Sequence, residues 1–413
     1  MTDTWHTDGR LHHGVGIEDT FIPAERVGQR KLDEYELTQH YHHWREDLRL
    51  AAESGATLIR WGSPWYLVEP EEGRFDFRWL DEVMAEMRAL GLHCVLDVMH
   101  YGTPLWLANA FLDPRYPELV ARYAAAVAER YPGVVDDLTP LNEPMVNAIW
   151  CGRDGRWPPY LTGDDGLVSV LIPLARGMVA TQRAVAAVRP GLRFVHVDAG
   201  FIFEGNGPGG LSLADGESWR FLALDLITGR VDPDHPLYDY LVQHGAREED
   251  LAALRRDAVQ PDVVGVNYYP AFTTQAVTAD GAESPVEAGT AGLVELLGVY
   301  HRRYDLPLAI TETSRATRDV AAKAQWVDDL LDTVAQVRAE GVPVTAVFWF
   351  PLLDLVDWSY RDGTAPADEY LMPFGLVDLV RGPDNVLARV PNAAYDRWRT
   401  RVTTTGGSSA HRA

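Results

Sequence analysis

Two glutamates follow strand-like segments and could together perform acid–base and nucleophilic chemistry. Glu143 ends the run Thr-Pro-Leu-Asn-Glu at 139–143, and Glu312 ends the run Ala-Ile-Thr-Glu at 309–312. Cleavage of a glycosidic bond needs a protonated carboxyl group to assist the departing oxygen and an ionised carboxylate to attack the anomeric carbon. Because two carboxyl groups in a partly buried site push each other's pKa values apart, a close pair would supply that asymmetry. Taken singly, each glutamate could equally be an ordinary salt-bridge partner at a strand end.

Pairing these glutamates requires a scaffold that brings the ends of distant strands together. Short apolar runs alternate with longer amphipathic segments, a pattern typical of parallel βα units. The strand-like runs are 13–17, 57–61, 93–98, 135–141, 193–197, 263–266, 306–311 and 344–350. Helical patterns include 37–54, 79–90, 117–131, 168–188 and 320–340. Eight units without a linker predict a single (β/α)₈ barrel over residues 1–402, with the two glutamates at the carboxyl ends of strands four and seven, where barrel enzymes carry their sites.

Three segments depart from this alternation. Residues 198–217 and 355–387 are too long for simple connections, so we predict inserted loops after strands five and eight. Residues 403–413 are rich in Thr, Gly and Ser and are predicted to form a disordered C-terminal tail.

The formal net charge of −23 argues against nucleic acid and anionic membrane surfaces as partners, because both need basic patches. It favours a neutral or cationic small molecule, although solubility alone would also explain it. No stretch approaches 18 uninterrupted apolar residues, and the N-terminus lacks the charged-then-apolar pattern of a signal segment. We therefore expect a cytoplasmic protein without a membrane span.

Metal and disulfide chemistry have weak signals. The only cysteines are Cys94 and Cys151, which could form one disulfide but need not. His40 and His43 share a helix face, but this helix precedes the second strand and lies away from the predicted site. We expect no metal site and no cofactor.

Motifs distributed along the chain resemble those of the clan A glycoside hydrolases, and within them the family 1 β-glucosidases and β-galactosidases. The resemblance runs from about residue 14 to residue 379 and keeps the family's order. It rests on YHHWRED at 41–47, LIRW at 58–61, DVMHYGTPLWL at 97–107, TPLNEP at 139–144, VGVNYY at 264–269, ITE at 310–312, and FW through DW at 348–358 with FGLV at 374–377.

The resemblance implies catalytic and supporting roles for six residues. Glu143 would be the acid/base and Glu312 the nucleophile of a retaining β-glycosidase, with carboxyl groups about 5 Å apart. Arg60 would hold Glu312 ionised and oriented. Asn142 would bind the sugar 2-hydroxyl. Tyr269 would donate to the nucleophile, and Asn267 would support the pair.

The resemblance also implies a sugar-binding set. His100 would bind a hydroxyl, with Tyr101 beside it. Trp349 would form the platform under the sugar ring, because aromatic faces suit the apolar faces of pyranoses. Asp357 would accept two hydroxyls at the far end of the pocket, with Trp358 alongside.

The chain departs from the family in the pocket that identifies the sugar. The glutamine expected after the first strand is absent, and Glu18 is the candidate replacement. Asp357 stands where a longer glutamate is expected, and Thr313-Ser314 follow the nucleophile in place of Asn-Gly. A deoxy, amino or otherwise modified sugar is therefore an alternative to glucose as the sugar that the pocket binds. A 6-phospho sugar is disfavoured because Asp357 would repel the phosphate.

The sequence leaves two alternatives to hydrolysis open. The same residues would serve a transglycosylase, in which an acceptor alcohol replaces water. A catalytically silent sugar-binding barrel is disfavoured by the presence of both glutamates together with Asn142, Arg60 and Tyr269. The sequence is silent on a homo-oligomer, for which the 355–387 loop could provide contacts.

Overall fold

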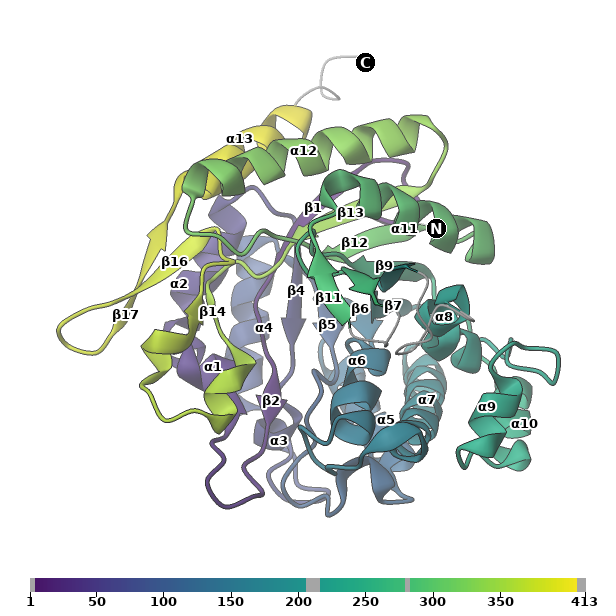
Figure 1. The fold of residues 1–413 in the computed structure, drawn as a ribbon. Coiled ribbons are helices and arrows are strands. Elements are labelled where there is room, and N and C mark those ends of the chain that lie inside the picture. Colours follow the sequence, from purple (N-terminus) through teal and green to yellow (C-terminus); the bar gives the residue numbers. More distant parts are fainter. Residues whose placement is uncertain (1–3, 206–215, 279–282, 407–413) are drawn as a thin grey trace.

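Eight parallel strands close into a barrel in the computed structural model, which describes residues 4–205, 216–278 and 283–406 (Figure 1). The strands lie around the barrel in chain order, so each pairs with the next and the last pairs with the first. They are β1 (His12–Gly16), β4 (Leu58–Gly62), β5 (His93–Asp97), β6 (Val135–Thr139), β7 (Arg193–Ala199), β9 (Val263–Asn267), β12 (Leu308–Glu312) and β13 (Val344–Trp349). The predicted (β/α)₈ fold is confirmed, with each strand within a few residues of its predicted range.

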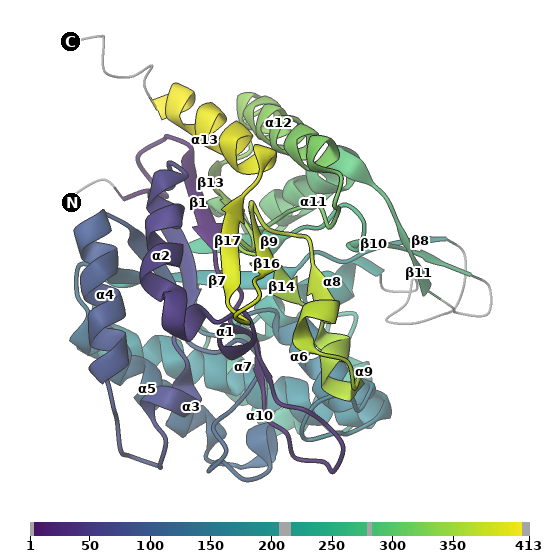
Figure 2. The ribbon, with the colours of Figure 1, turned by 90° about the vertical axis from the view of Figure 1, so that its left-hand side faces the viewer.

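Helices cover the outside of the barrel (Figures 1 and 2). The main ones are α2 (His40–Glu53), α4 (Arg78–Leu90), α5 (Tyr116–Arg130), α7 (Gly163–Val188), α8 (Gly216–Ile227), α11 (Gly289–Tyr304), α12 (Val320–Ala339) and α13 (Ala393–Gly406). Shorter ones are α1 (Glu34–Leu37), α3 (Trp65–Val68), α6 (Pro144–Ala148), α9 (Tyr238–Gln243) and α10 (Glu248–Arg256). No helix in the described part of the chain has the length and apolar character of a membrane span.

The predicted helix 37–54 is divided in two. Gln39 adopts a left-handed conformation with φ 62°, so the chain turns between α1 and α2. The Asp33 carboxylate accepts from the Glu36 amide and caps α1, which begins before the predicted range. An apolar periodicity cannot reveal a single left-handed residue, because the pattern continues across it.

The predicted long loops carry secondary structure of their own. After β7, β8 (Ile202–Gly205) pairs with β10 (Thr274–Val277), which pairs with β11 (Glu283–Val286). Residues 206–215 of the predicted loop lie outside the described residues. After β13, β14 (Leu355–Val356) pairs with β15 (Leu371–Met372), and β16 (Val377–Arg381) pairs with β17 (Leu387–Pro391). Before α1, β2 (Phe21–Ile22) pairs with β3 (Leu32–Asp33).

The C-terminal boundary differs from the prediction. Helix α13 lies along α12 and continues through residues 403–406, which were predicted to be a disordered tail (Figure 2). The hydroxyls of Thr403 and Thr404 donate to carbonyls one turn earlier, those of Arg399 and Thr400. Helix α13 therefore includes threonines whose composition had suggested a disordered segment. Residues 407–413 of the predicted tail lie outside the described residues.

The His40 cluster has a structural role. The His40 side chain is buried, its Nδ1 lies 2.8 Å from Asp47 Oδ2, and Trp61 Nε1 donates to its Nε2 at 3.1 Å. Asp47 also accepts from Arg389 of β17 at 2.9 Å. These contacts fasten the β16–β17 hairpin to α2.

The base of the barrel is closed by the N-terminal segment. Trp5 is buried against inward-facing strand residues that include Leu58 and Phe348. Its indole Nε1 donates to Asp137 Oδ2 at 3.0 Å, and Asp137 also pairs with Arg193 at 2.7 Å. The sequence interpretation did not assign Trp5 any role, because it precedes the first strand in a polar segment.

We predict that Trp5→Ala destabilises the fold by about 3 kcal/mol, because it opens a cavity at the base of the barrel and removes a partner of Asp137. Chemical denaturation of the variant and the wild type measures the change. Val27→Ala, at a fully exposed apolar side chain, is the control. A loss for Trp5→Ala no larger than that of the control would contradict this role.

Candidate functional site

A cavity of about 710 Å³ opens at the carboxyl ends of the barrel strands. Nine of the twelve residues predicted for the site line it: Glu18, His100, Tyr101, Glu143, Asn267, Tyr269, Glu312, Asp357 and Trp358. Arg60 and Asn142 lie directly behind these side chains and contact them, whereas Trp349 does not reach the cavity. The fold therefore brings eleven of the twelve together.

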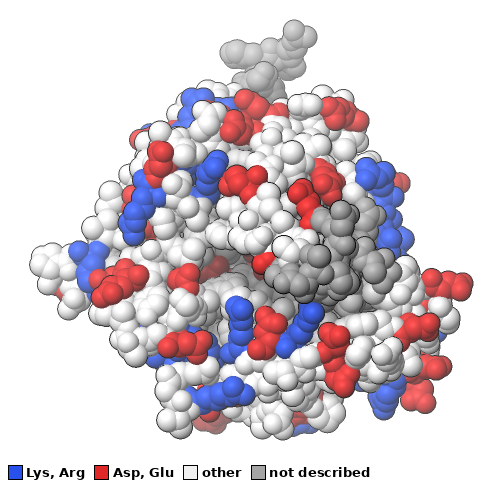
Figure 3. Space-filling model, in the orientation of Figure 1, with Lys and Arg blue, Asp and Glu red and all other residues white. Residues whose placement is uncertain are grey.

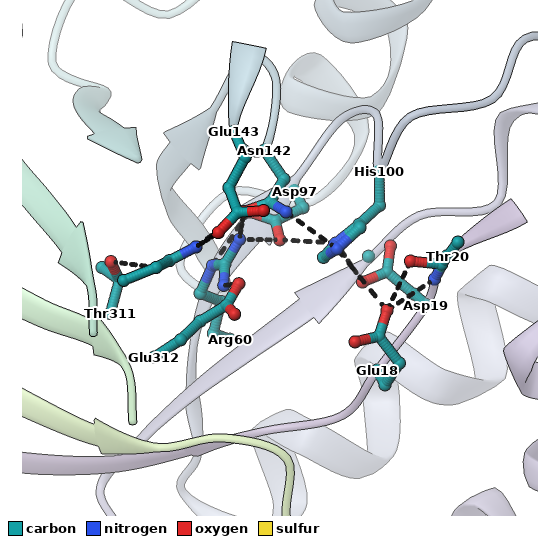
Figure 4. Close-up of polar contacts among 12 residues, drawn as sticks. Glu18, Asp19, Thr20, Arg60, Asp97, His100, Asn142, Glu143, Thr311 and Glu312 are labelled. Carbon is teal, nitrogen blue, oxygen red and sulfur yellow. Dashed lines mark hydrogen bonds and ion pairs between the residues drawn. The ribbon is translucent and has the colours of Figure 1, made fainter. Parts of the chain in front are cut away.

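The buried Arg60 guanidinium is the hub of the site (Figure 4). Arg60 ends inside the barrel because it shares the inward face of β4 with Leu58. Its Nη2 lies 2.7 Å from Asp97 Oδ2 on the neighbouring strand β5 and donates to Asn142 Oδ1 at 2.6 Å. Its Nη1 donates to Glu312 Oε1 across the barrel. One cation thus joins three separate strand ends.

Glu312 is held from both of its carboxyl oxygens. Arg60 contacts Oε1, and the Tyr269 phenol donates to Oε2 at 2.6 Å. Burial raises the pKa of Glu312 above its usual value, while the Arg60 cation favours the ionised form. These two contacts favour the ionised form of a buried carboxyl group.

Glu143 has a different environment. Asn267 Nδ2 donates to its Oε1 at 2.8 Å, and its Oε2 contacts the Tyr101 phenol. No cation touches this carboxyl group among the contacts of the described residues. Burial, and then repulsion from Glu312, raise the pKa of Glu143 to about 7. Burial and the nearby Glu312 thus give Glu143 a raised pKa, which suits a group that donates a proton near neutral pH.

The backbone around Glu143 is fixed as firmly as its side chain. Glu143 adopts a left-handed conformation, φ 44°, in the turn from β6 into α6. Its amide donates to Val197 O on β7 at 3.1 Å, and its carbonyl accepts from Asn147 N at 3.0 Å. These two bonds hold a conformation that non-glycine residues rarely adopt.

A second group of charges surrounds His100 (Figure 4). His100 Nδ1 lies 2.9 Å from Asp19 Oδ1, and Asn142 Nδ2 lies 2.9 Å from its Nε2. Glu18 lies 3.5 Å from Nε2 and accepts from the Thr20 amide and hydroxyl at 2.9 and 2.6 Å. Glu18 therefore lines the cavity in a fixed orientation. The sequence interpretation missed Asp19 and Asp97, whose acidic side chains gave no periodic signal.

The donor atoms of Asp19, Asp97 and His100 lie close enough together to be considered as metal ligands. However, Arg60 already neutralises Asp97, and His100 lies against Asp19. The three side chains therefore belong to a network of ion pairs that includes Arg60.

The outer wall of the cavity is mainly aromatic and apolar. Trp358 makes edge contacts with Tyr101, Trp150 and Trp157 at centroid distances of 5.1–5.5 Å. The remaining apolar lining consists of Val146, Phe201, Leu355, Met372, Phe374 and Phe272, the last of which is exposed. Trp150 and Trp157 were not predicted, although both follow Glu143 closely in the sequence. Asp357 reaches the cavity and accepts from the Ser359 amide at 2.8 Å.

The predicted Trp349 platform is wrong. Along β13, Ala346 and Phe348 face into the barrel, so strand alternation turns Trp349 outward. There its Nε1 donates to Phe374 O at 3.3 Å and its ring packs on Trp398 of α13. The inward residue is Phe350, whose ring lies between Arg60 and His100 with centroid distances of 5.2 and 6.3 Å.

The Phe350 ring also accounts for the glycine at position 16. A Cβ atom at Gly16 would lie 2.0 Å from the Phe350 ring, so only glycine fits beside it. The first strand therefore passes Phe350 closely and places Glu18 at the cavity two residues later.

Charged side chains are mixed on the face drawn in Figure 3, where Lys and Arg are interspersed with Asp and Glu. On the described part of this face, Lys and Arg do not gather into one large patch.

We predict that Glu312→Gln lowers the pKa of Glu143, because it removes the negative charge that disfavours ionisation of Glu143. NMR titration of ¹³C-carboxyl-labelled glutamate, with Glu143→Gln to assign the signal, measures the shift. Glu53→Gln, on the outer helix α2, is the matched control and should leave the titration unchanged. An unchanged pKa in Glu312→Gln would show that the two carboxyl groups are not coupled.

Comparisons with known proteins find similarity to beta-galactosidases and beta-glucosidases. A glycoside hydrolase family 42 model, described as beta-galactosidase, matches residues 35–133. The beta-galactosidase BgaA of Thermus sp is 33% identical over 115 residues, which are 22% of this chain and 18% of that protein. This chain thus spans less than a fifth of that relative's length. The beta-glucosidase of Agrobacterium sp. is 24% identical over 416 residues and covers 90% of this chain and 85% of that protein.

The fold has a close counterpart among solved structures. The beta-glucosidase from Thermotoga maritima in complex with azafagomine superposes with a TM-score of 0.79 at 18% identity, covering 97% of this chain and 98% of that chain. This likeness shows a shared fold. The family 42 match and the relatives that extend along most of the sequence support a relationship to the clan A glycoside hydrolases.

Proposed function

We propose that the protein is a retaining β-glycosidase, β-glucosidase-like in its chemistry, that hydrolyses O-glycosidic bonds by double displacement. The observation that carries the proposal is the pair Glu143 and Glu312 in one cavity with opposite electrostatic settings. Relatives named beta-glucosidase and beta-galactosidase support a β-glycosidase.

In the first step Glu312 attacks the anomeric carbon while Glu143 donates its proton to the departing oxygen. Arg60 and Tyr269 hold the Glu312 carboxylate in place before attack. In the second step Glu143, now ionised, serves as the base that activates water, and Glu312 leaves. The raised pKa of Glu143 allows it to fill both roles near neutral pH.

The polar floor and the aromatic wall of the cavity would bind different parts of the substrate. The sugar would lie on the polar floor formed by Glu18, His100, Asn267 and the two catalytic glutamates. The leaving group would face the aromatic wall around Trp150 and Phe272, which suits an apolar alcohol. An acceptor alcohol bound at the same wall would give transglycosylation, so acceptor-dependent products are the sign of that alternative.

The acidic side chains that line the cavity favour an uncharged sugar over a phosphorylated one. Glu18 and Asp357 are acceptors that suit hydroxyl donors, and both would repel a phosphate. Arg361 does not offset this repulsion, because its side chain is buried and donates to Ile22 O and Tyr160 Oη.

We predict that the first product released from a β-glycoside has the β configuration, because two displacements restore the original stereochemistry. ¹H NMR of the anomeric signals during the first minutes of turnover measures it, before mutarotation mixes the anomers. Glu312→Ala should abolish nearly all turnover in the same assay. An α product, or full activity of Glu312→Ala, would contradict the assignment.

We predict cleavage of unphosphorylated nitrophenyl β-glycosides and no preference for their 6-phospho counterparts, since Glu18 and Asp357 would repel a phosphate. A panel of gluco, galacto, fuco and amino sugars, each with and without the phosphate where available, would rank kcat/KM. Activity confined to phosphorylated members would overturn the neutral-glycone assignment.

A further inference from the structure

Asn147 is a buried residue of α6 that contacts the turn carrying Glu143 without reaching the cavity. Its side chain is fully buried, and it is not among the described residues that line the cavity. Its backbone amide donates to Glu143 O at 3.0 Å, which is the first hydrogen bond of α6. Asn147 therefore lies one helical turn after the acid/base candidate, in a position from which it cannot touch a substrate.

The side-chain amide of Asn147 joins two further segments. Its Nδ2 donates to Tyr101 O at 3.2 Å, in the turn that follows β5. Its Oδ1 accepts from Cys151 Sγ at 3.1 Å, in the π-helical turn Ile149–Arg153 that continues α6 and carries Trp150 of the aromatic wall. One buried amide thus connects the turn of the acid/base candidate, the turn after β5 and the wall that would face the leaving group.

The chemistry of the contacting groups determines how the Asn147 amide is oriented. A backbone carbonyl can only accept a hydrogen bond, so the amide nitrogen must be the atom that faces Tyr101 O. The amide oxygen then faces Cys151, whose thiol is a weak donor. An amide supplies a donor on one side and an acceptor on the other, whereas an aliphatic side chain of similar size supplies neither.

The Tyr101 turn needs support because its backbone conformation is unfavourable. Tyr101 has φ 75°, in the left-handed region that non-glycine residues rarely adopt. A residue keeps such a conformation only where its surroundings hold it in place. The hydrogen bond from Asn147 is one such restraint, and the ring contacts of Tyr101 with His100 and Trp157, at centroid distances of 4.8 and 5.1 Å, are others.

The placement of Tyr101 matters because its phenol contacts Glu143. The phenol oxygen lies against Glu143 Oε2, and Asn142 Nδ2 donates to the same phenol at 2.9 Å. The other carboxyl oxygen, Glu143 Oε1, accepts from Asn267. A shift of the Tyr101 backbone would therefore move one of the two neutral groups that hold the Glu143 carboxyl group in place.

We propose that Asn147 is a positioning residue for Glu143, which it holds, through the Tyr101 turn and the start of α6, where the leaving oxygen requires a proton donor. This role rests on the proposed glycosidase function. Glu143 itself donates the proton, and Asn147 acts only by holding the two turns together. The contact with Cys151 extends the same restraint to the segment that carries Trp150, so the acid and the wall for the leaving group keep one relative position.

Asn147→Leu tests this role, because leucine has a similar size but lacks the amide donor and acceptor. We expect kcat/KM on an alkyl β-glycoside to fall about tenfold, because its leaving oxygen needs a well-placed proton donor. On the 2,4-dinitrophenyl glycoside, whose leaving group departs as an anion, kcat/KM should be nearly unchanged. On that substrate kcat and KM should fall together, because the second step still needs Glu143 as the base.

The pKa of Glu143 provides a second readout, one that needs no turnover. Burial, and then the charge of Glu312, raise this pKa to about 7. Three neighbouring side chains lower it: Tyr101, Asn267 and His100. If the Tyr101 contact is loosened in Asn147→Leu, the pKa of Glu143 should rise, which carboxyl ¹³C NMR titration measures. The basic limb of the kcat/KM profile with the alkyl glycoside should then move to higher pH, because Glu143 stays protonated longer.

Gln182→Leu is the matched control. Gln182 is another buried amide on a helix, α7, and its Nε2 donates to the backbone carbonyl of Gln260. Neither residue is among the described residues that line the cavity, so this variant should keep the wild-type dependence on the leaving group. Titration with a 2-fluoro dinitrophenyl glycoside counts the active sites, so that rates refer to folded protein. If Asn147→Leu does not fold, Asn147→Ser, whose shorter side chain also lacks the amide, replaces it.

Equal losses on both substrates, or a wild-type dependence on the leaving group together with an unchanged pKa of Glu143, would overturn the positioning role. A wild-type protein that cleaves no glycoside would instead overturn the proposed function. In that case the NMR titration would still decide whether Asn147 acts on Glu143.

Discussion

The buried Arg60 guanidinium is the interaction on which the rest of the site depends. It joins Asp97 on the next strand, Glu312 across the barrel and Asn142 beside the acid/base candidate. A fully buried cation is stable only when its donors are matched by acceptors and opposite charge. Because the planar guanidinium presents several donors at fixed angles, it also orients each of these groups, which an ammonium could not do. The barrel strands bring the acceptors together, and the arginine fixes their geometry.

From this hub the two glutamates acquire different properties. Glu312 is paired with the Arg60 cation and accepts a hydrogen bond from the Tyr269 phenol. Glu143 contacts only neutral groups, the Asn267 amide and the Tyr101 phenol, among the described residues. Both are buried, so the low dielectric strengthens every interaction and the repulsion between them. The ionisation of each carboxyl group therefore depends on the charge of the other carboxyl group. In the proposed mechanism, the carboxyl group that contacts Arg60 is the nucleophile and the other is the proton donor.

Much of the scaffold could be predicted from sequence, because a parallel barrel repeats one local pattern eight times. The strand ranges and the strand-end glutamates follow from that repetition, whereas the grouping of Asn267, Tyr269 and His100 with them was implied by the family resemblance. Their placement in one cavity depends only on strand order, which the chain follows without exception. The catalytic assignments themselves remain proposals.

What could not be predicted depended on single residues and on long-range contacts. The Trp349 platform failed because a fully buried strand shows no alternation in its sequence, so the facing of Trp349 and Phe350 could not be distinguished. The closure of the barrel base by Trp5 depends on a contact with Asp137, far away in the chain. Likewise, the hydrogen bond between Tyr101 and Glu143 requires two left-handed turns that leave no compositional mark.

The central claim is that Glu312 forms a covalent bond with the sugar. A 2-deoxy-2-fluoro β-glycoside with a good leaving group tests it most directly, because the fluorine slows release of the glycosyl–enzyme. Mass spectrometry of the intact protein and of its peptic peptides would detect the adduct. We predict one sugar per chain, attached to Glu312. An adduct on another residue, or turnover without an adduct and with inversion of configuration, would contradict it.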